Sequence, residues 1–454
     1  MAHTRWVTRS GVKELSTELD GALLEHPDFT PFNLAYSLRP AATVAAASAS
    51  DVATTVAWAA RRGLRVAVMA TGHGVTADVE DCVLITTDRM NRVSVDPGAR
   101  IATIGAGATW GQVVQAGAPY GLAPINGSSS GVGAVGYTLG GGNGPLSRAF
   151  GFAADHVRRA TLVDGTGAVR EVDAASDPDL FWALRGGKGN FGVATELEID
   201  LMPVATLYGG CVFYPGAAAA DVVSAFAEWS TDLPERVSTT SIALLRLPPL
   251  PELPEPIRGQ FVVSVRYAHL DGAEAGAEEF APMRAVATPL IDGIHEMPYT
   301  AVDSIHLDPT EPVPYHEGGA CLSGLPGDAV SALLDAAGPG RDIPIVLIEL
   351  RRLGGAMARP PSIPNAVNAR DAAYSLSTIG LLAGDAASTV PNVIDRIVGS
   401  VGPWRTSHDL FNLIGPATRD RISTLWSQAD RARLVDIKRR VDPAGMFGAG
   451  HTIT

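Results

Sequence analysis

The chain has 454 residues, of which 46% are hydrophobic and 18% are charged, so it has the composition of a packed globular protein and the length for two or three domains. Its 35 Lys and Arg residues against 48 Asp and Glu residues leave a net charge of −13, which argues against a broad basic surface for nucleic acid or anionic lipid. The polar amino terminus lacks the apolar region of a signal peptide, and no stretch approaches the roughly 18 apolar residues of a membrane span. We therefore expect a cytoplasmic protein with no nucleic-acid or membrane partner.

An amphipathic helix is predicted directly after Ser50 and Asp51, where the run VATTVAWAARRG begins, because its apolar residues recur at helical spacing and it closes with two arginines and a glycine. The following RVAVMA reads as a short strand that breaks into TGHG, which places His73 on a loop at the end of that strand. A strand CVLITT, a hairpin RVSVD-PGA-RIATIGA and a helix from Thr109 to about Ala116 come next. The order of elements predicts a mixed α+β fold.

The glycine-rich stretch NGSSSGVGAVGYTLGGGNGPLSR matches the dinucleotide-binding pattern GxGxxG at Gly131, Gly133 and Gly136. A Rossmann domain needs a strand before this pattern and a helix after it, whereas the preceding PINGSSS is no strand and the following GGGNG opposes a helix. A second match, in RGGKGNFG, follows a helix and leads into a strand, which is the reverse of the required order. We therefore do not expect a Rossmann-type nicotinamide site.

Three glycine-rich loops remain to be explained, around His73, from Ser128 to Gly144 and from Gly186 to Gly192. Tight turns are the simplest explanation, but a turn needs one or two glycines, and each further glycine costs roughly 0.5–1 kcal/mol relative to alanine. Backbone N–H groups free of side chains form nests that bind anions. We therefore favour loops that cradle the pyrophosphate of a cofactor.

The second half begins near Ala205 with a strand, YGGCVFYPG, and a helix, AAAADVVSAFAEWS, followed by the strands SIALLRL and QFVVSVRYAHL on either side of a proline-rich loop. Farther on, PIVLIELRRLGGA reads as a strand with apolar residues on both faces, so that Glu349 is an acid among buried neighbours. Either Glu349 pairs with an arginine such as Arg351 or Arg370, or burial raises its pKa and makes it a base.

The sequence offers little support for disulfides or a metal. Cys82, Cys211 and Cys321 lie more than a hundred residues apart and form no CxxC pair, which fits a reducing compartment. The histidines show no HxH or HExxH spacing. No metal site is expected.

The whole chain resembles the vanillyl-alcohol oxidase / p-cresol methylhydroxylase (PCMH-type) FAD flavoprotein superfamily, in its berberine-bridge-enzyme-like branch. The motifs that carry the resemblance are AVMATGHG, GSSSGVGAVGYTLGGGNGPLSRAFGFAADHV, DLFWALRGGKGNFGVATELEIDLMPV and IKRRVDPAGMFGAGHTI. The resemblance implies an α+β protein with a bipartite FAD-binding domain, residues 1–204 and 407–454. A substrate domain of antiparallel sheet covered by helices, residues 205–406, is expected between the two parts.

Within this resemblance His73 corresponds to the histidine that carries the flavin on its 8α-methyl group. The cysteine of the family's second linkage is replaced by Ser129, so we expect FAD to be attached through His73 only. TGHG departs from the family's usual GGHS, which leaves the hydrogen bonding of the linkage open. Val132 resembles the residue that admits oxygen to the flavin, and Tyr137 takes a position near the flavin where relatives often hold a histidine. The FAD-binding residues that the resemblance implies are Ala70, Thr71, Gly72, His73, Gly74, Val75, Ser128, Ser129, Val132, Gly133, Gly136, Gly141, Gly142, Gly144, Leu146, Asp155, Gly189, Asn190, Gly192 and Val193.

The catalytic base of berberine-bridge-type relatives has no counterpart here, because residues 356–369 contain neither Asp nor Glu. The ELxxLGGA motif with Glu349 instead is similar to bacterial flavoenzymes that tailor polyketides and related antibiotics. Phe411 stands where the family commonly has a tyrosine over the flavin ring, which leaves His451, Tyr374 and Tyr137 as further catalytic candidates beside Glu349.

The resemblance therefore implies an FAD-dependent oxidase of secondary metabolism, for which a polyketide-like or other hydroxylated small molecule is the expected substrate. Hydride would pass to flavin N5 while Glu349 removes the hydroxyl proton, and dioxygen would reoxidise the flavin. Two alternatives stay open: a cyclase or isomerase without net redox change, and a protein that only binds the metabolite in the same pocket.

Overall fold

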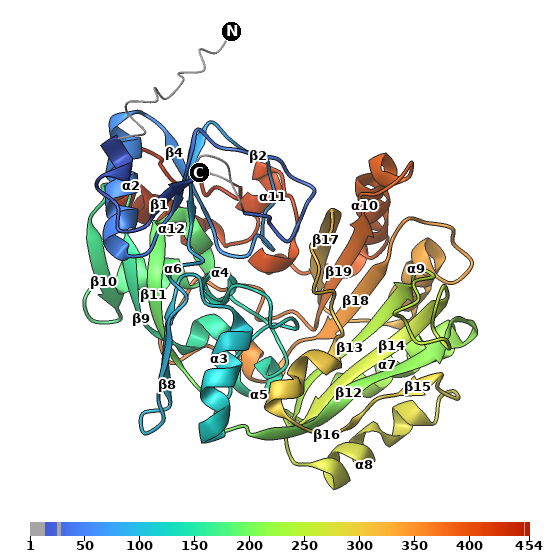
Figure 1. The fold of residues 1–454 in the computed structure, drawn as a ribbon. Helices are drawn as coiled ribbons and strands as arrows, with labels where there is room; N and C mark the ends of the chain where they lie inside the picture. The colour runs from blue at the N-terminus through green and yellow to red at the C-terminus, as the bar shows by residue number, and fades with distance from the viewer. Residues whose placement is uncertain (1–13, 25–28, 449) are drawn as a thin grey trace.

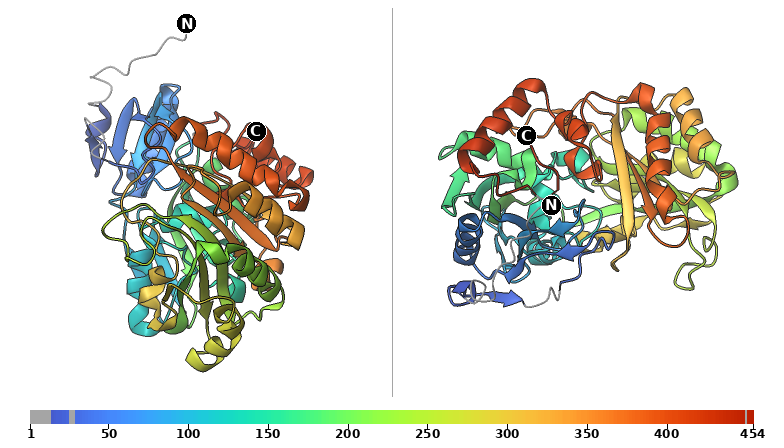
Figure 2. Two further views of the ribbon diagram at one scale, coloured as in Figure 1. Left: turned by 90° about the vertical axis from the view of Figure 1, so that its right-hand side faces the viewer. Right: turned by 90° about the horizontal axis from the view of Figure 1, so that it is seen from above.

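The computed structural model describes residues 14–24, 29–448 and 450–454. It consists of two lobes with a cavity between them. Seen from above, the first half of the chain and its extreme carboxy terminus lie on one side, and the segment between them forms the other side (Figure 2). None of the helices in the described ranges has the length and apolarity to cross a membrane.

A small, mainly parallel sheet supports the loop that carries His73. Its strand order is β1-β3-β6-β4, and β3, β6 and β4 run parallel. The strands are β1 (Ala22–Leu24), β3 (Ala42–Ala45), β6 (Cys82–Thr86) and β4 (Arg65–Met69). Helix α2 (Ala49–Arg61) packs on this sheet and begins earlier than predicted, because the Ser48 side chain, rather than Ser50, accepts the capping hydrogen bond from the Asp51 N–H. A separate two-stranded pair joins β2 (Leu38–Arg39) to β5 (Val79–Glu80).

A five-stranded antiparallel sheet forms the rest of the first lobe, and it contains the predicted hairpin β7–β8. In sheet order the strands are β10 (Val169–Asp173), β9 (Val157–Val163), β11 (Val193–Asp200), β8 (Ile101–Gly105) and β7 (Val93–Asp96). The helices of this part are α3 (Trp110–Gly117), α4 (Ala134–Leu139), α5 (Ser147–Phe150) and α6 (Pro178–Gly187). The short helix α4 lies inside the glycine-rich stretch, where no helix was expected, and it ends at the first glycine of GGGNG.

The carboxy-terminal segment returns to the first lobe. Helices α11 (Arg419–Ser423) and α12 (Gln428–Val441), red in Figure 1, lie among the blue and green elements. Leucine and isoleucine side chains of α12 join the apolar core that α6 and the five-stranded sheet build. The ammonium of Lys438 pairs with Asp442 at 2.9 Å and donates to the carbonyl of Asn190 at 2.8 Å. The two ends of the chain thus share one core.

The second lobe is a large antiparallel sheet with helices on one face only. Its strand order is β15-β12-β14-β13-β18-β19-β17, and β16 also pairs with β12. The strands are β12 (Thr206–Pro215), β13 (Val237–Arg246), β14 (Phe261–His269), β15 (Ile291–Asp292), β16 (His295–Pro298), β17 (Tyr315–Leu322), β18 (Leu347–Arg352) and β19 (Tyr374–Leu381). The covering helices are α7 (Ala219–Trp229), α8 (Ala273–Arg284), α9 (Gly327–Ala337) and α10 (Val390–Ser400). The opposite face is left for the cavity. The boundaries at 204/205 and 406/407 stay a prediction.

One buried arginine joins the two lobes. The Arg148 side chain comes from α5 in the first lobe and is only 3% exposed. Its guanidinium donates to carbonyls of the second lobe, to Val237 at 3.0 Å, to Leu233 at 2.8 Å and to Leu353. Burial lowers its pKa to about 10, so the group stays charged at neutral pH. A planar guanidinium can serve several carbonyls at once, which an ammonium cannot do in the same geometry.

We predict that Arg148→Lys lowers the free energy of unfolding by about 2–4 kcal/mol, because hydrogen bonds from a buried cation to main-chain carbonyls are lost. Urea unfolding followed by circular dichroism measures the change. Arg158→Lys is the matched control, since Arg158 pairs with Asp200 on the surface and should change stability by less than about 1 kcal/mol. Equal effects of the two substitutions would contradict the role given to Arg148.

Candidate functional site

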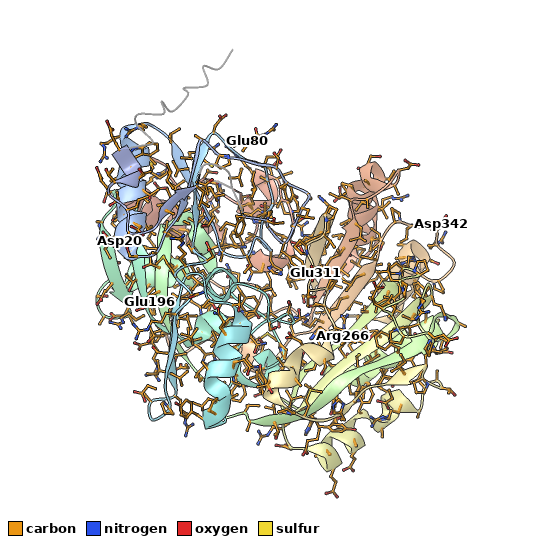
Figure 3. All side chains as sticks on the ribbon, in the orientation of Figure 1. Asp20, Glu80, Glu196, Arg266, Glu311 and Asp342 are labelled. Atoms are coloured by element: carbon orange, nitrogen blue, oxygen red, sulfur yellow. The ribbon has the colours of Figure 1, made fainter. Side chains whose placement is uncertain are left out.

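A cavity of about 1120 Å³ lies between the glycine-rich loops of the first lobe and the uncovered face of the large sheet. Arg266, labelled in Figure 3, lies where the two lobes meet and lines this cavity. The residues that line it from the first lobe and the tail come from segments 66–79, 127–143, 188–194 and 411–413, together with Phe447, Gly450 and His451. A cavity of this size, built from two lobes, has room for a large cofactor together with a small substrate.

His73 sits on the wall of the cavity in a fixed orientation. Its ring stacks on Phe32, with 3.9 Å between ring centroids and 11° between ring planes, and its Nδ1 lies 2.8 Å from the hydroxyl of Thr71. The Tyr315 hydroxyl donates to the His73 carbonyl at 2.9 Å. Burial lowers the pKa of His73 to about 4. The imidazole is therefore neutral near pH 7, which is the form that can act as a nucleophile. Thr71, the first residue of TGHG, thus supplies the side-chain hydrogen bond that the sequence left open.

At two positions on the floor of the cavity, neither backbone conformation nor a contact with a described residue requires glycine. Gly136 lies inside helix α4, and Gly189 lies in the loop before β11. A Cβ atom added at either position would meet no protein atom within 4 Å, and neither residue has a positive φ. Glycine in a helix costs up to about 1 kcal/mol relative to alanine, so the empty space beside them is where a ligand can approach the backbone. The floor therefore fits a flat, extended cofactor such as FAD.

Fifteen of the twenty residues predicted to bind FAD line the cavity: Ala70, Thr71, Gly72, His73, Gly74, Val75, Ser128, Ser129, Val132, Gly133, Gly136, Gly189, Asn190, Gly192 and Val193. The other five lie behind it, where Gly141, Gly142, Gly144 and Leu146 pack against protein atoms and Asp155 pairs with Arg370 at 2.6 Å. The Cβ of a residue larger than glycine at position 144 would lie 1.7 Å from the carbonyl oxygen of Asn126. These five residues therefore shape the backbone behind the cavity and are not placed to touch a ligand in it.

Glu349 lies on the cavity face of β18 and is paired with two arginines. Its carboxylate lies 2.7 Å from Arg266 Nη1 and 2.9 Å from Arg351 Nη2, and it accepts a hydrogen bond from Ser241 at 2.6 Å. Burial alone would raise its pKa, but the charges of Arg351 and Arg266 outweigh burial and hold the pKa well below its usual range. Of the two arginines considered from sequence, Arg351 is the partner. The raised pKa expected of a buried base is not found here.

The other catalytic candidates take different places. Tyr137 lines the cavity with its hydroxyl buried and without a hydrogen-bond partner in the structure, and burial raises its pKa. His451 also lines it, 2.8 Å from the Gly415 carbonyl, and burial lowers its pKa to about 4. Tyr374 points to the helix-covered face of the sheet, where its hydroxyl lies 2.7 Å from that of Ser230. Tyr374 is therefore separated from the cavity by the sheet itself.

Sequence reasoning missed two charged residues in the cavity, Glu317 on β17 and Lys188 in the loop before β11. Burial raises the pKa of Glu317 to about 7, and the charge of Lys188 opposes that rise. Burial lowers the pKa of Lys188. The signal for Glu317 was an isolated acid in the strand YHEGGACL, but its facing depends on strand register. Lys188 has a positive φ of 57°, which the sequence does not indicate for a lysine.

Comparison with known proteins identifies a family model and several proteins that are similar to this chain. Residues 40–173 match the family model described as an FAD binding domain. The chain is 36% identical over 203 residues to an FAD-dependent monooxygenase of Fusarium proliferatum, covering 44% of this chain and 39% of that protein. It is 29% identical over 275 residues to (R)-6-hydroxynicotine oxidase of Paenarthrobacter nicotinovorans, covering 60% of this chain and 58% of that protein. The alignments thus span less than two thirds of the length of these two relatives.

Solved structures with the same fold cover nearly the whole chain. 6-Hydroxy-D-nicotine oxidase from Arthrobacter nicotinovorans superposes with a TM-score of 0.81 at 22% identity, over 96% of this chain and 98% of that one. BBE-like 1 of Physcomitrella patens gives a TM-score of 0.83 at 20% identity, over 98% and 99%. A glucooligosaccharide oxidase from Acremonium strictum gives 0.83 at 20% identity, over 98% and 99%. At these identities the likeness concerns the fold.

We predict that Gly136→Ala weakens FAD binding at least about tenfold, because the added methyl group enters the space left for the cofactor. The substitution should not lower the stability of the protein without cofactor, since alanine favours a helix by up to about 1 kcal/mol. Gly399→Ala is the matched control: Gly399 lies in α10 away from the cavity, and a Cβ there also meets no atom within 4 Å. FAD content per protein and unfolding of the apoprotein are the measurements. Full FAD content in Gly136→Ala would contradict the cofactor position.

Proposed function

We propose that the chain belongs to the vanillyl-alcohol oxidase / p-cresol methylhydroxylase superfamily of FAD-binding proteins, in its berberine-bridge-enzyme-like branch, and that it is an oxygen-using oxidase of a hydroxylated small molecule. The observation that carries the proposal is the neutral His73 beside a glycine-floored cavity. A polyketide-like compound or another secondary metabolite is the proposed substrate. The non-redox alternatives are less favoured, because the curated relatives are named as oxidases, monooxygenases and oxidoreductases.

FAD bound in the cavity would supply hydride acceptance from the substrate and transfer of two electrons to dioxygen. The residues proposed to hold it are the fifteen that line the cavity. His73 is proposed to hold the flavin's 8α-methyl carbon covalently, and a neutral ring on a rigid stack with Phe32 suits that role. Ser129 also lines the cavity, but its hydroxyl cannot form the thioether of a second linkage. Attachment through His73 alone is therefore proposed.

Oxygen access is assigned to Val132. This side chain lines the cavity and is partly buried, so it leaves space that a larger residue would fill. Dioxygen is small and apolar, and an apolar wall admits it without cost in hydrogen bonds. This placement supports an oxidase over a dehydrogenase with a larger acceptor.

Removal of the substrate's hydroxyl proton is assigned to Glu317, in place of Glu349. Two arginines keep Glu349 ionised and occupy its oxygens, so it acts as a fixed charge. Glu317 faces the same cavity with a pKa of about 7, which suits a group that must take up a proton and release it again at neutral pH. The charge of Lys188 acts on Glu317, and the charge of Glu317 in turn helps to raise the pKa of Tyr36 and of Tyr315. The charge of Lys188 also helps to lower the pKa of His451.

If Glu317 is the base, kcat/KM should rise with pH through about 7 as the carboxyl group loses its proton. In Glu317→Gln this acid limb should disappear, and kcat/KM should fall by about 10²-fold or more. Lys188→Met should move the limb to higher pH, because the lysine charge lowers the pKa of Glu317. Glu278→Gln on the covering helix α8 is the control and should leave the profile unchanged. An acid limb that persists in Glu317→Gln would assign the base elsewhere.

The proposed activity is tested by mixing the FAD-loaded protein with a panel of hydroxylated aromatic and polyketide-like compounds. We expect at least one compound to bleach the flavin absorption without oxygen and to release hydrogen peroxide in stoichiometric amount with oxygen. Conversion of a compound to an isomer with no bleaching and no peroxide would contradict the proposed oxidase activity. It would support a cyclase or isomerase activity without net redox change.

A further inference from the structure

Two arginines and one glutamate form a compact charged group on the cavity face of the large sheet. Arg266 on β14 and Arg351 on β18 both pair in register with Ser241 on the strand between them, so the three side chains leave the sheet on the same face. Glu349 bridges the two guanidinium groups, and the His306 ring lies 3.7 Å from the same carboxylate. We call these four residues, Arg266, His306, Glu349 and Arg351, the arginine cluster.

The arginine cluster carries one positive charge in excess. Two guanidinium groups meet one carboxylate, and His306 adds no charge because burial and the two arginines hold its pKa well below the usual range. The side chains of Arg266 and Arg351 are only 4% and 10% exposed. Asp308 acts on Arg351 from the cavity rim without forming an ion pair with it. An unbalanced charge is costly to bury.

The cluster also has hydrogen-bonding capacity that the protein does not use. Nε of Arg266, Nε of Arg351 and both ring nitrogens of His306 are buried and have no hydrogen-bond partner in the structure. His306 is 3% exposed and lines the cavity. Buried polar groups in folded proteins almost always have partners, so several unpartnered nitrogens beside one cavity wall single out the arginine cluster as a candidate ligand-binding site.

We infer that the arginine cluster binds a carboxylate group of the substrate. The inference rests on the proposed function and narrows its substrate to hydroxylated molecules that carry an anionic group. Guanidinium and carboxylate match in charge and in planar geometry, and their hydrogen bonds are stronger than neutral ones. A cationic amine would meet an excess of like charge there, and a neutral sugar would leave the charge unbalanced. An ionised oxygen of FAD would pair with the arginines in the same way as a carboxylate of the substrate. The experiment below distinguishes these two ligands.

The test uses the FAD-loaded protein with benzoate and benzamide, which share a shape and differ in charge. Binding is measured by isothermal titration calorimetry and by the shift of the flavin absorption spectrum. We expect benzoate to bind at least about tenfold more tightly than benzamide. Equal affinities in the loaded protein would overturn the inference. A preference for benzoate that appears only in the protein without FAD would assign the cluster to the cofactor and would equally overturn the substrate site.

Variants that change the charge of the arginine cluster test whether that charge causes the preference for benzoate. Arg351→Gln removes the excess charge and should weaken benzoate binding about tenfold, whereas Glu349→Gln adds to it and should strengthen binding. Arg352→Gln is the matched control, because Arg352 is the next residue of β18 and points to the other face, where it donates to Ser230 and Ala373. It should change benzoate affinity less than about twofold. If Arg351→Gln does not fold, Glu349→Gln alone tests the inference. Weaker benzoate binding in that variant would overturn it.

The outcome is separable from that of the proposed function. A protein that is bleached by neutral hydroxylated compounds but shows no benzoate preference loses the carboxylate site and keeps the oxidase activity. A protein that prefers benzoate but is bleached by no compound keeps the site and loses the oxidase activity.

Discussion

The open space beside bare backbone on the cavity floor is the constraint on which the rest of the structure depends. Gly136 and Gly189 leave open space where a side chain would cost less on folding, and residues on the uncovered face of the large sheet line the same cavity. The two surfaces belong to different parts of the chain. The buried Arg148 joins the two lobes through hydrogen bonds, and residues of the carboxy-terminal segment line the cavity.

The uncovered sheet face sets two carboxylates in opposite environments. Glu349 lies beside two arginines, so its proton is lost at any physiological pH, while Glu317 lies two strands away with burial as the main influence and holds its proton up to about pH 7. Two acids whose environments shift their pKa values in opposite directions can take different roles in proton transfer. One acid fixes a charge near the arginines, and the other is free to exchange a proton. His73 is kept neutral in a similar way, because burial lowers its pKa.

Local patterns in the sequence predicted much of this structure. The α+β architecture with a bipartite FAD-binding lobe is confirmed, as are the His73 loop after β4 and the β7–β8 hairpin. What failed depended on facing or on tertiary contacts. Tyr374 was predicted to be catalytic, but the register of β19 places its side chain on the helix-covered face. Glu317 was not predicted, because the face on which its side chain lies also depends on strand register. Gly144 looked like a ligand-binding glycine, but the carbonyl of Asn126 is what requires it.

We propose that FAD lies in the cavity between the lobes and is attached to His73 alone. An absorption spectrum of the purified protein before and after acid precipitation, with peptide mass analysis of the pellet, tests it most directly. We predict flavin absorption that stays with the precipitated protein and one FAD mass on the peptide that contains His73. Flavin released to the supernatant would contradict the covalent bond, and a colourless protein that takes up no FAD would contradict the cofactor itself.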